Sequence, residues 1–172
     1  MLSKTLIIMG SARSDGNTRK IVDVIITKTG ADFIDLTTHK ISYFDYEHRN
    51  KNDEFVSIAT KMVDYEQIIF ATPVYWYAMS AQLKTFFDRL SDLLTIRKPL
   101  GRQLRGGKKM YSIACSSDAT AYDGFIMPFK NTAEYLGMEY GGHLHSWYDE
   151  EKDRIPIAVR SAIDLFCEKI DY

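Results

Sequence analysis

The sequence lacks several features that define whole classes of protein. Its 172 residues contain two cysteines, Cys115 and Cys167, which form neither a C-x-x-C motif nor a metal-ligand spacing. Both lie in apolar patterns, so we expect buried free thiols and a reduced, cytoplasmic setting. No apolar run reaches the roughly 18 residues that a membrane span needs. We also expect no signal peptide, because the sequence runs straight into a strand-like segment.

An excess of charge of one sign is also missing. The 22 basic and 23 acidic residues leave a net charge of −1, so no nucleic-acid partner is expected. The local exception is residues 97–109, which hold basic side chains and no acidic one. A solvated loop is the favoured interpretation of this segment, and a contact with a dinucleotide phosphate is the alternative. The length and the 45% hydrophobic content suit a single globular domain over residues 1–172.

Strand-like runs alternate with helix-like segments along the whole chain. Helical spacing of apolar residues, glycine stops and a cap at Ser80 separate the strands. Strict alternation implies a parallel sheet with helices on both faces, that is, a three-layer doubly wound α/β fold. The polar stretch 39–53 is expected to be an ordered but exposed loop. The predicted strands are about 5–9, 31–36, 67–72, 110–115 and 140–145, and the predicted helices are about 17–29, 53–65, from Ser80, 125–136 and from Pro156.

The loop after the first strand, residues 10–18, is rich in hydrogen-bond donors. It is neither a P-loop nor a G-x-G-x-x-G fingerprint. A helix follows it directly, and helix N-termini with unpaired N–H groups favour bound phosphate. An arginine adds a planar fork that matches phosphate oxygens. The alternative is an ordinary strand–helix turn. The candidate phosphate ligands are Ser11, Arg13, Ser14, Asn17 and Thr18.

Two further loops follow the third and fourth predicted strands, and in a doubly wound sheet they meet the first loop at one edge. Residues 72–80 carry Tyr75, Trp76 and Tyr77, whose rings suit a planar ligand, a sheet edge or a dimer contact. Residues 115–120 are small and polar, so their backbone can approach a ligand closely. A routine small-residue loop is an equal alternative for this segment.

The motifs GSxRxxGNT at residues 10–18 and TPVYW…SAQLKTFFDR at residues 72–89 resemble those of the NAD(P)H-dependent FMN reductase family. The resemblance covers most of the chain and implies a flavodoxin-like, five-stranded parallel sheet with strand order 2-1-3-4-5. It also implies bound FMN, NAD(P)H as co-substrate, and a homodimer or homotetramer with contacts at the aromatic loop and residues 90–94. Hydride would pass to the flavin, and electrons would pass on to a quinone, a nitro or azo compound, a metal ion or free flavin.

The resemblance assigns the five residues of the first loop to the FMN phosphate. It assigns Pro73, Val74, Tyr75 and Trp76 to the isoalloxazine ring. It assigns Ser116, Ser117 and Asp118 to the ring's N1/O2 edge or the ribityl chain. No side-chain acid or base is expected to be catalytic, because the cofactor does the chemistry.

The residues also bear on three other possibilities: an electron carrier, an iron–sulfur cluster and a metal site. A flavodoxin-type electron carrier, which binds FMN without using NAD(P)H, is the main alternative function. Against it stand the near-neutral charge and Arg13, since such carriers tend to be acidic and to lack this arginine. An iron–sulfur cluster is not expected, because residues 40–52 contain no cysteine. His143 and His145 have no evident third ligand, so no metal site is expected.

Overall fold

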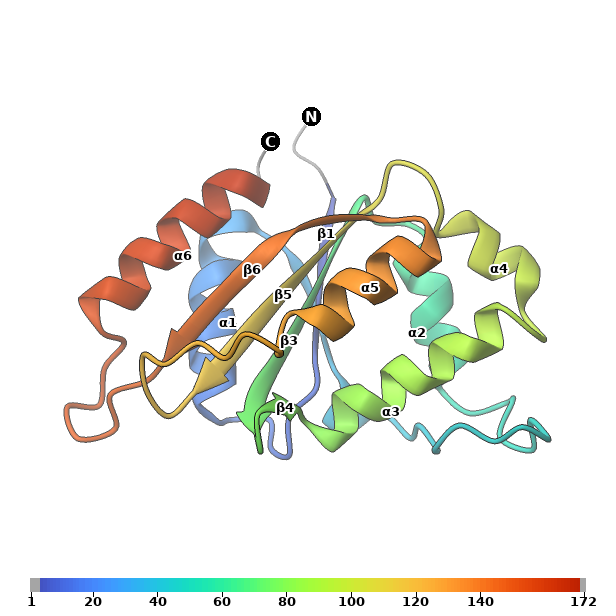
Figure 1. The fold of residues 1–172 in the computed structure, drawn as a ribbon, viewed down its shortest axis with the longest axis horizontal. Helices are drawn as coiled ribbons and strands as arrows, with labels where there is room; N and C mark the ends of the chain where they lie inside the picture. The colour runs from blue at the N-terminus through green and yellow to red at the C-terminus, as the bar shows by residue number, and fades with distance from the viewer. Residues whose placement is uncertain (1–3, 171–172) are drawn as a thin grey trace.

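The computed structural model describes residues 4–170 and shows a parallel sheet between two layers of helices (Figure 1). The strand order is β2-β1-β3-β5-β6, so the expected order of five parallel strands is confirmed, with a short antiparallel strand, β4, added beside β3. The strands are β1 (Thr5–Met9), β2 (Asp32–Asp35), β3 (Gln67–Tyr75), β4 (Ala78–Met79), β5 (Lys109–Ser116) and β6 (Glu139–Trp147). The α-helices are α1 (Asn17–Thr29), α2 (Phe55–Met62), α3 (Ala81–Arg89), α4 (Lys98–Gln103), α5 (Met127–Leu136) and α6 (Ile157–Ile170).

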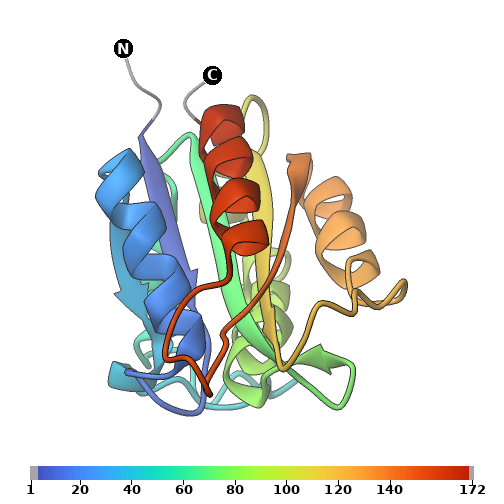
Figure 2. The same cartoon turned by 90° about the vertical axis from the view of Figure 1, so that its left-hand side faces the viewer.

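Each face of the sheet has its own hydrophobic core. Side chains alternate along a strand, so Leu6 and Ile8 of β1 pack with α2, α3 and α5, whereas Ile7 and Met9 pack with α1 and α6. All five residues of β1 are buried, as expected for a central strand covered on both sides. Figure 2 shows α1 and α6 side by side across one face. No helix within residues 4–170 is long and apolar enough to cross a membrane.

Several predicted elements have different bounds in the structure. The third strand was predicted to end at Thr72, but β3 continues to Tyr75 and turns back through β4, so the aromatic loop is a β-hairpin. Residues 98–103 form α4 within the segment predicted to be a loop, and Pro99 lies in its first turn, where its missing N–H costs nothing. Helix α2 is shorter than the predicted 53–65. The predicted contact segment 90–94 is partly unavailable to a partner, because Leu90 and Leu93 are buried.

The long loop between β2 and α2 is fixed by a buried arginine. Arg89, at the end of α3, is fully buried and binds Asp53 at 2.5 Å and Asp92 at 2.9 Å. Its guanidinium also donates to the carbonyls of Ser42 and Asn50. Burial alone would raise the pKa of Asp53, but the hydrogen bonds from Arg89 and from backbone N–H groups lower it overall. The loop is therefore ordered and largely exposed, as expected, and Arg89 also anchors it to the core.

Replacing this arginine should destabilise the fold severely. In Arg89→Ala, the buried carboxylate of Asp92 and the partly buried carboxylate of Asp53 lose their cation, so we expect the free energy of unfolding to fall by about 3–5 kcal/mol. Urea unfolding at neutral pH measures this loss. Lys84→Ala is the control, because the Lys84–Asp88 pair on the same helix is exposed and should contribute little. Equal losses in the two variants would show that Arg89 does not anchor the loop.

Candidate functional site

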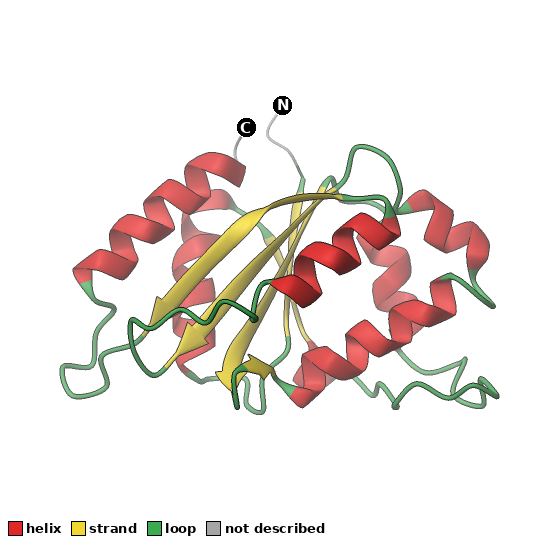
Figure 3. Ribbon diagram, viewed as in Figure 1, coloured by secondary structure: helices red, strands yellow, loops and turns green. Residues whose placement is uncertain are grey.

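The carboxyl ends of β1, β3 and β5 meet at one edge of the sheet, opposite the two chain ends (Figure 3). The chain passes from β1 outward to β2 and then crosses back to β3 on the other side of β1. This change of direction leaves a crevice between the loops that follow β1 and β3, where ligands bind in open α/β sheets. The three loops singled out in the sequence all lie at this edge.

Hydrogen bonds centred on Gly10 and Ser80 join the first two loops. Gly10 N–H donates to the Ala71 carbonyl at 2.9 Å, and the Ser80 hydroxyl donates to the Gly10 carbonyl at 2.7 Å. The Ser80 N–H donates to the Thr72 hydroxyl at 3.0 Å, and Ser80 Oγ also caps α3 by accepting from Leu83 N. A Cβ on Gly10 would lie 2.6–2.8 Å from Leu83 atoms, two of them backbone. Glycine therefore allows α3 to start against β1.

The loop between β1 and α1 presents donors around an open helix terminus. The side chains of Ser11 and Thr18 are buried, and that of Arg13 is exposed. Gly16 occupies the N-cap position of α1 and supplies no capping side chain. The first-turn N–H groups of a helix without a side-chain cap can serve a ligand. A Cβ on Gly16 would lie 2.9 Å from Arg13 Nε, so this glycine lets the arginine fold across the loop.

The hairpin after β3 has its two-residue turn at Trp76 and Tyr77. Both have positive φ, 49° and 65°, which is the geometry of a type I′ turn. The Trp76 side chain is 93% exposed at the tip. Tyr77 packs edge-on against Tyr122, with ring centroids 4.9 Å apart, so the hairpin touches the segment that precedes α5.

The loop after β5 is ordered by its own side chains. Ser116 Oγ donates to the Asp118 carbonyl at 2.5 Å, and Asp118 Oδ1 accepts from Thr120 N at 2.7 Å. The Thr120 N–H is the main reason that the pKa of Asp118 is lowered. His145 Nε2 lies 3.2 Å from the same carbonyl, so β6 supports the loop from one side. Ser117 follows the end of β5 in this loop.

The three loops enclose one cavity of about 230 Å³, which we call the site cavity. Nine of the twelve predicted site residues line it: Ser11, Arg13, Asn17, Thr18, Pro73, Val74, Tyr75, Ser116 and Ser117. The other three lie elsewhere. Ser14 lines a separate groove with Arg19 and Phe33, and Asp118 lines an adjoining cavity. Trp76 is 93% exposed at the hairpin tip and does not line the site cavity.

Three further residues line the site cavity but were not among the predicted site residues: Gly16, Cys115 and Glu150. Cys115 ends the apolar pattern of β5, and its burial raises the pKa of the thiol to about 11, so it stays protonated and unreactive at neutral pH. Glu150 comes from the segment between β6 and α6, far from the recognised motifs. The sequence could have indicated Glu150, because this residue follows the last strand, which ends at the same edge of the sheet as the three loops.

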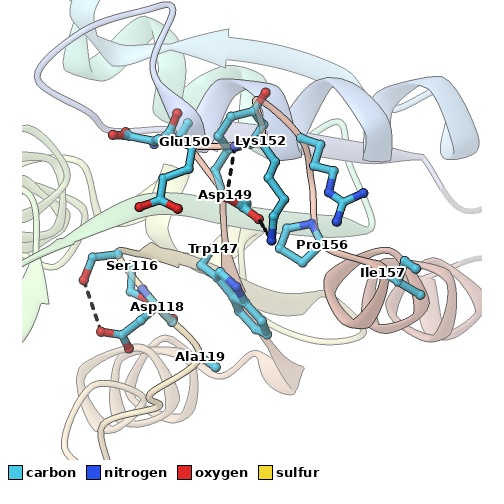
Figure 4. Close-up of a pocket in the computed structure, with 14 residues that line it drawn as sticks. Ser116, Asp118, Ala119, Trp147, Asp149, Glu150, Lys152, Pro156 and Ile157 are labelled. Carbon is cyan, nitrogen blue, oxygen red and sulfur yellow. Dashed lines mark hydrogen bonds and ion pairs between the residues drawn. The ribbon is translucent and has the colours of Figure 1, made fainter.

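The adjoining cavity is larger, about 650 Å³, and shares Asn17, Ser116, Ser117 and Glu150 with the site cavity. Figure 4 shows it between the loop after β5 and the segment after β6, with Trp147 between them. Most of the predicted residues converge on the smaller cavity, so we place the candidate site there. Its volume is below the roughly 300–1,000 Å³ of sites that enclose a whole small molecule, so a cofactor must extend beyond it.

Known proteins with related sequences settle the family. A family model for NADPH-dependent FMN reductases matches residues 3–144. The chain belongs to this family of FMN reductases. It is 32% identical over 150 residues to a Bacillus subtilis protein named as an NAD(P)H-dependent FMN-containing oxidoreductase, covering 82% of this chain and 83% of the relative. It is 25% identical over 167 residues to an FMN-dependent NADH:quinone oxidoreductase of Bordetella parapertussis, covering 78% and 79%.

Solved structures share the fold of this chain. The Trp repressor binding protein of Bacillus subtilis superposes with a TM-score of 0.73 at 28% identity, covering 94% of this reductase chain and 97% of its own. An FMN-dependent NADH-azoreductase from Bacillus anthracis, solved with FMN, shares the fold with a TM-score of 0.68 at 13% identity, covering 98% of each chain. Membership of the family makes the chain an NAD(P)H-dependent flavoprotein oxidoreductase with FMN as its cofactor.

The residues of the site cavity fit FMN by their chemistry. Hydroxyl, amide and guanidinium donors gather at the end formed by the β1–α1 loop, as an anionic phosphate requires. Proline, valine and tyrosine lie at the end formed by the hairpin, as a flat apolar ring requires. The single carboxylate among the lining residues is that of Glu150.

His143 and His145 of β6 face separate partners in this reductase. His143 Nδ1 lies 2.8 Å from Ser112 Oγ, which also bonds Tyr140 Oη at 2.6 Å. His145 lies at the loop after β5. Within residues 4–170, no group of three or more His, Cys, Asp or Glu side chains could hold a metal ion. Burial is the main cause that lowers the pKa of His143 to about 4.

Gly10→Ala should disrupt the joint between the first two loops. The added methyl would meet the backbone of Leu83, which cannot move without displacing α3, so we expect a loss of roughly 3 kcal/mol in the free energy of unfolding. Urea unfolding measures the loss. Gly124→Ala is the control, because a Cβ there meets no atom within 4 Å. A Gly10→Ala variant as stable as Gly124→Ala would contradict the close approach.

His143 should make the folded state sensitive to acid. Its pKa is about 4 in the folded protein against an ordinary 6.5, so between these values the unfolded chain binds a proton that the folded chain does not. Stability is therefore full above pH 6.5 and falls as the pH drops toward 4. From pH 7 to pH 5, wild type should lose roughly 2 kcal/mol more than His143→Gln in urea unfolding. Parallel losses would refute this assignment.

Proposed function

We propose that the chain transfers reducing equivalents from NAD(P)H, through FMN held in the site cavity, to a small-molecule acceptor such as a quinone, a nitro or azo compound, a metal ion or free flavin. The observation that carries the proposal is the convergence of three loops, one rich in donors and one aromatic, on a single cavity. When bound, FMN supplies the redox chemistry by accepting hydride and giving up electrons. The protein's residues bind and orient it.

The phosphate end is formed by the β1–α1 loop. Arg13 offers a planar fork of donors, and the hydroxyls of Ser11 and Thr18 lie buried beside the open N-terminus of α1. Asn17 adds an amide donor from the first residue of that helix. Together these groups would fix the phosphate and set the direction in which the rest of the cofactor leaves the cavity.

The ring end is formed by the hairpin. Pro73 and Val74 continue β3, so their backbone is held in the sheet, and Tyr75 is 44% exposed at the mouth of the cavity. Trp76 stands beyond the cavity at the hairpin tip. We infer that Tyr75 borders the ring, whereas Trp76 faces the open side where a nicotinamide or an acceptor would arrive. Ser117 would border the sugar chain from the opposite loop.

The test is an absorbance spectrum of the protein after addition of FMN and desalting, followed by anaerobic NADPH or NADH. We expect flavin absorbance that survives desalting and then bleaches on reduction. Retained flavin that neither nucleotide bleaches would instead point to a flavodoxin-type carrier. No retention, together with no affinity in a titration, would refute the proposal.

Two matched arginine variants connect this result to the site cavity. Arg13→Gln should retain less FMN than wild type, because the fork at the phosphate end is lost. Arg19→Gln removes the same charge from the side of α1, where Arg19 pairs with Asp23, and should retain FMN as wild type does. Equal retention by both variants would place the phosphate elsewhere.

A further inference from the structure

The segment that carries Glu150, residues 148–156 between β6 and α6, is held against α1; we call it the strap. Lys20 Nζ of α1 lies 3.8 Å from the centroid of the Tyr148 ring and 3.3 Å from Asp153 Oδ1. Tyr148 Oη donates to the same Asp153 oxygen at 2.8 Å. Asp149 and Arg154 pair their backbones as an antiparallel bridge. These contacts make the strap a defined turn with a fixed place beside the site cavity.

This placement brings a carboxylate to the phosphate end of the cavity. Glu150 Oε1 accepts a hydrogen bond from Asn17 Nδ2 at 2.7 Å, although 133 residues separate the two in sequence. Glu150 lines the same cavity as Ser11 and Arg13. Figure 4 shows Glu150 on the strap, on the side facing Ser116 and Asp118. An acceptor thus occupies one N–H of the amide that the proposed function gives to the FMN phosphate.

We propose that Glu150 is a built-in competitor of the FMN phosphate, and that it sets how strongly the site prefers phosphorylated over unphosphorylated flavin. The inference rests on the proposed function, because it takes the site cavity as the FMN site. The Asn17 amide nitrogen carries two N–H groups, so a phosphate that used it would either displace the carboxylate or bind beside it. Displacement loses a hydrogen bond, and binding beside the carboxylate leaves two groups of the same sign close together. Both arrangements oppose binding of FMN, whereas riboflavin carries no phosphate and avoids the repulsion.

The test uses Glu150→Gln, which removes the charge but keeps the shape and an oxygen that can still accept from Asn17. Dissociation constants for FMN and for riboflavin are measured by quenching of flavin fluorescence on the full chain freed of flavin. We expect the FMN constant to fall roughly fivefold to tenfold, by removal of a like charge a few ångströms away, and the riboflavin constant to stay within twofold. The gain for FMN should shrink at high salt.

Glu151→Gln is the matched control, because it removes the same charge from the next residue of the strap, which is also exposed but does not line the site cavity. It should leave both constants within twofold of wild type. An equal gain in both variants would show a general effect of net charge and would overturn the role of Glu150. Weaker binding of both flavins to Glu150→Gln would overturn it too, by showing that Glu150 accepts from hydroxyls of the sugar chain.

One outcome separates this inference from the proposed function. If wild type binds FMN and NADPH bleaches it, but Glu150→Gln binds FMN no better, the inference fails and the proposed function stands. If neither wild type nor either variant binds FMN or riboflavin, the proposed function fails and the inference fails with it.

Discussion

The site depends on one close approach, that of the start of α3 to the end of β1. Gly10 has no Cβ, so the backbone of Leu83 can lie where a methyl group would otherwise be. This proximity lets the Ser80 hydroxyl reach the Gly10 carbonyl while its N–H reaches Thr72. The loop with the phosphate donors and the hairpin with the aromatic residues are therefore joined directly, through buried hydrogen bonds that resist exchange with water.

The order of the strands explains why these loops meet at all. Parallel strands end at the same edge of the sheet. Because β1 lies between β2 and β3, the chain first crosses from β1 to β2 on one side and then returns to β3 on the other, which leaves a crevice at the end of β1. The pairing of Pro73 with Cys115 places the end of β5 beside the hairpin. Residues more than a hundred positions apart in sequence can thus line a cavity of about 230 Å³.

Much of this could be predicted from local patterns, and the exceptions have physical causes. The strands and the cap at Ser80 follow from apolar runs and side-chain chemistry that act within a few residues. The hairpin was missed because Trp76 and Tyr77 do not carry the Asn-Gly signal of a type I′ turn. Arg89 and Glu150 were missed because their roles come from tertiary partners, Asp53 in one case and Asn17 in the other.

The hairpin tip shows where the fold accepts a cost. Bulky residues with positive φ are strained by about 1–3 kcal/mol each, and Trp76 and Tyr77 both have this conformation. Tyr77 offsets part of the strain by packing against Tyr122, but Trp76 is 93% exposed and regains little from burial. Asparagine and glycine would be the most stable residues at these two positions of a type I′ turn. Strain and exposure coincide at Trp76, next to Tyr75, the last hairpin residue that lines the cavity, and this supports the proposed role of Trp76 at the open side of the site.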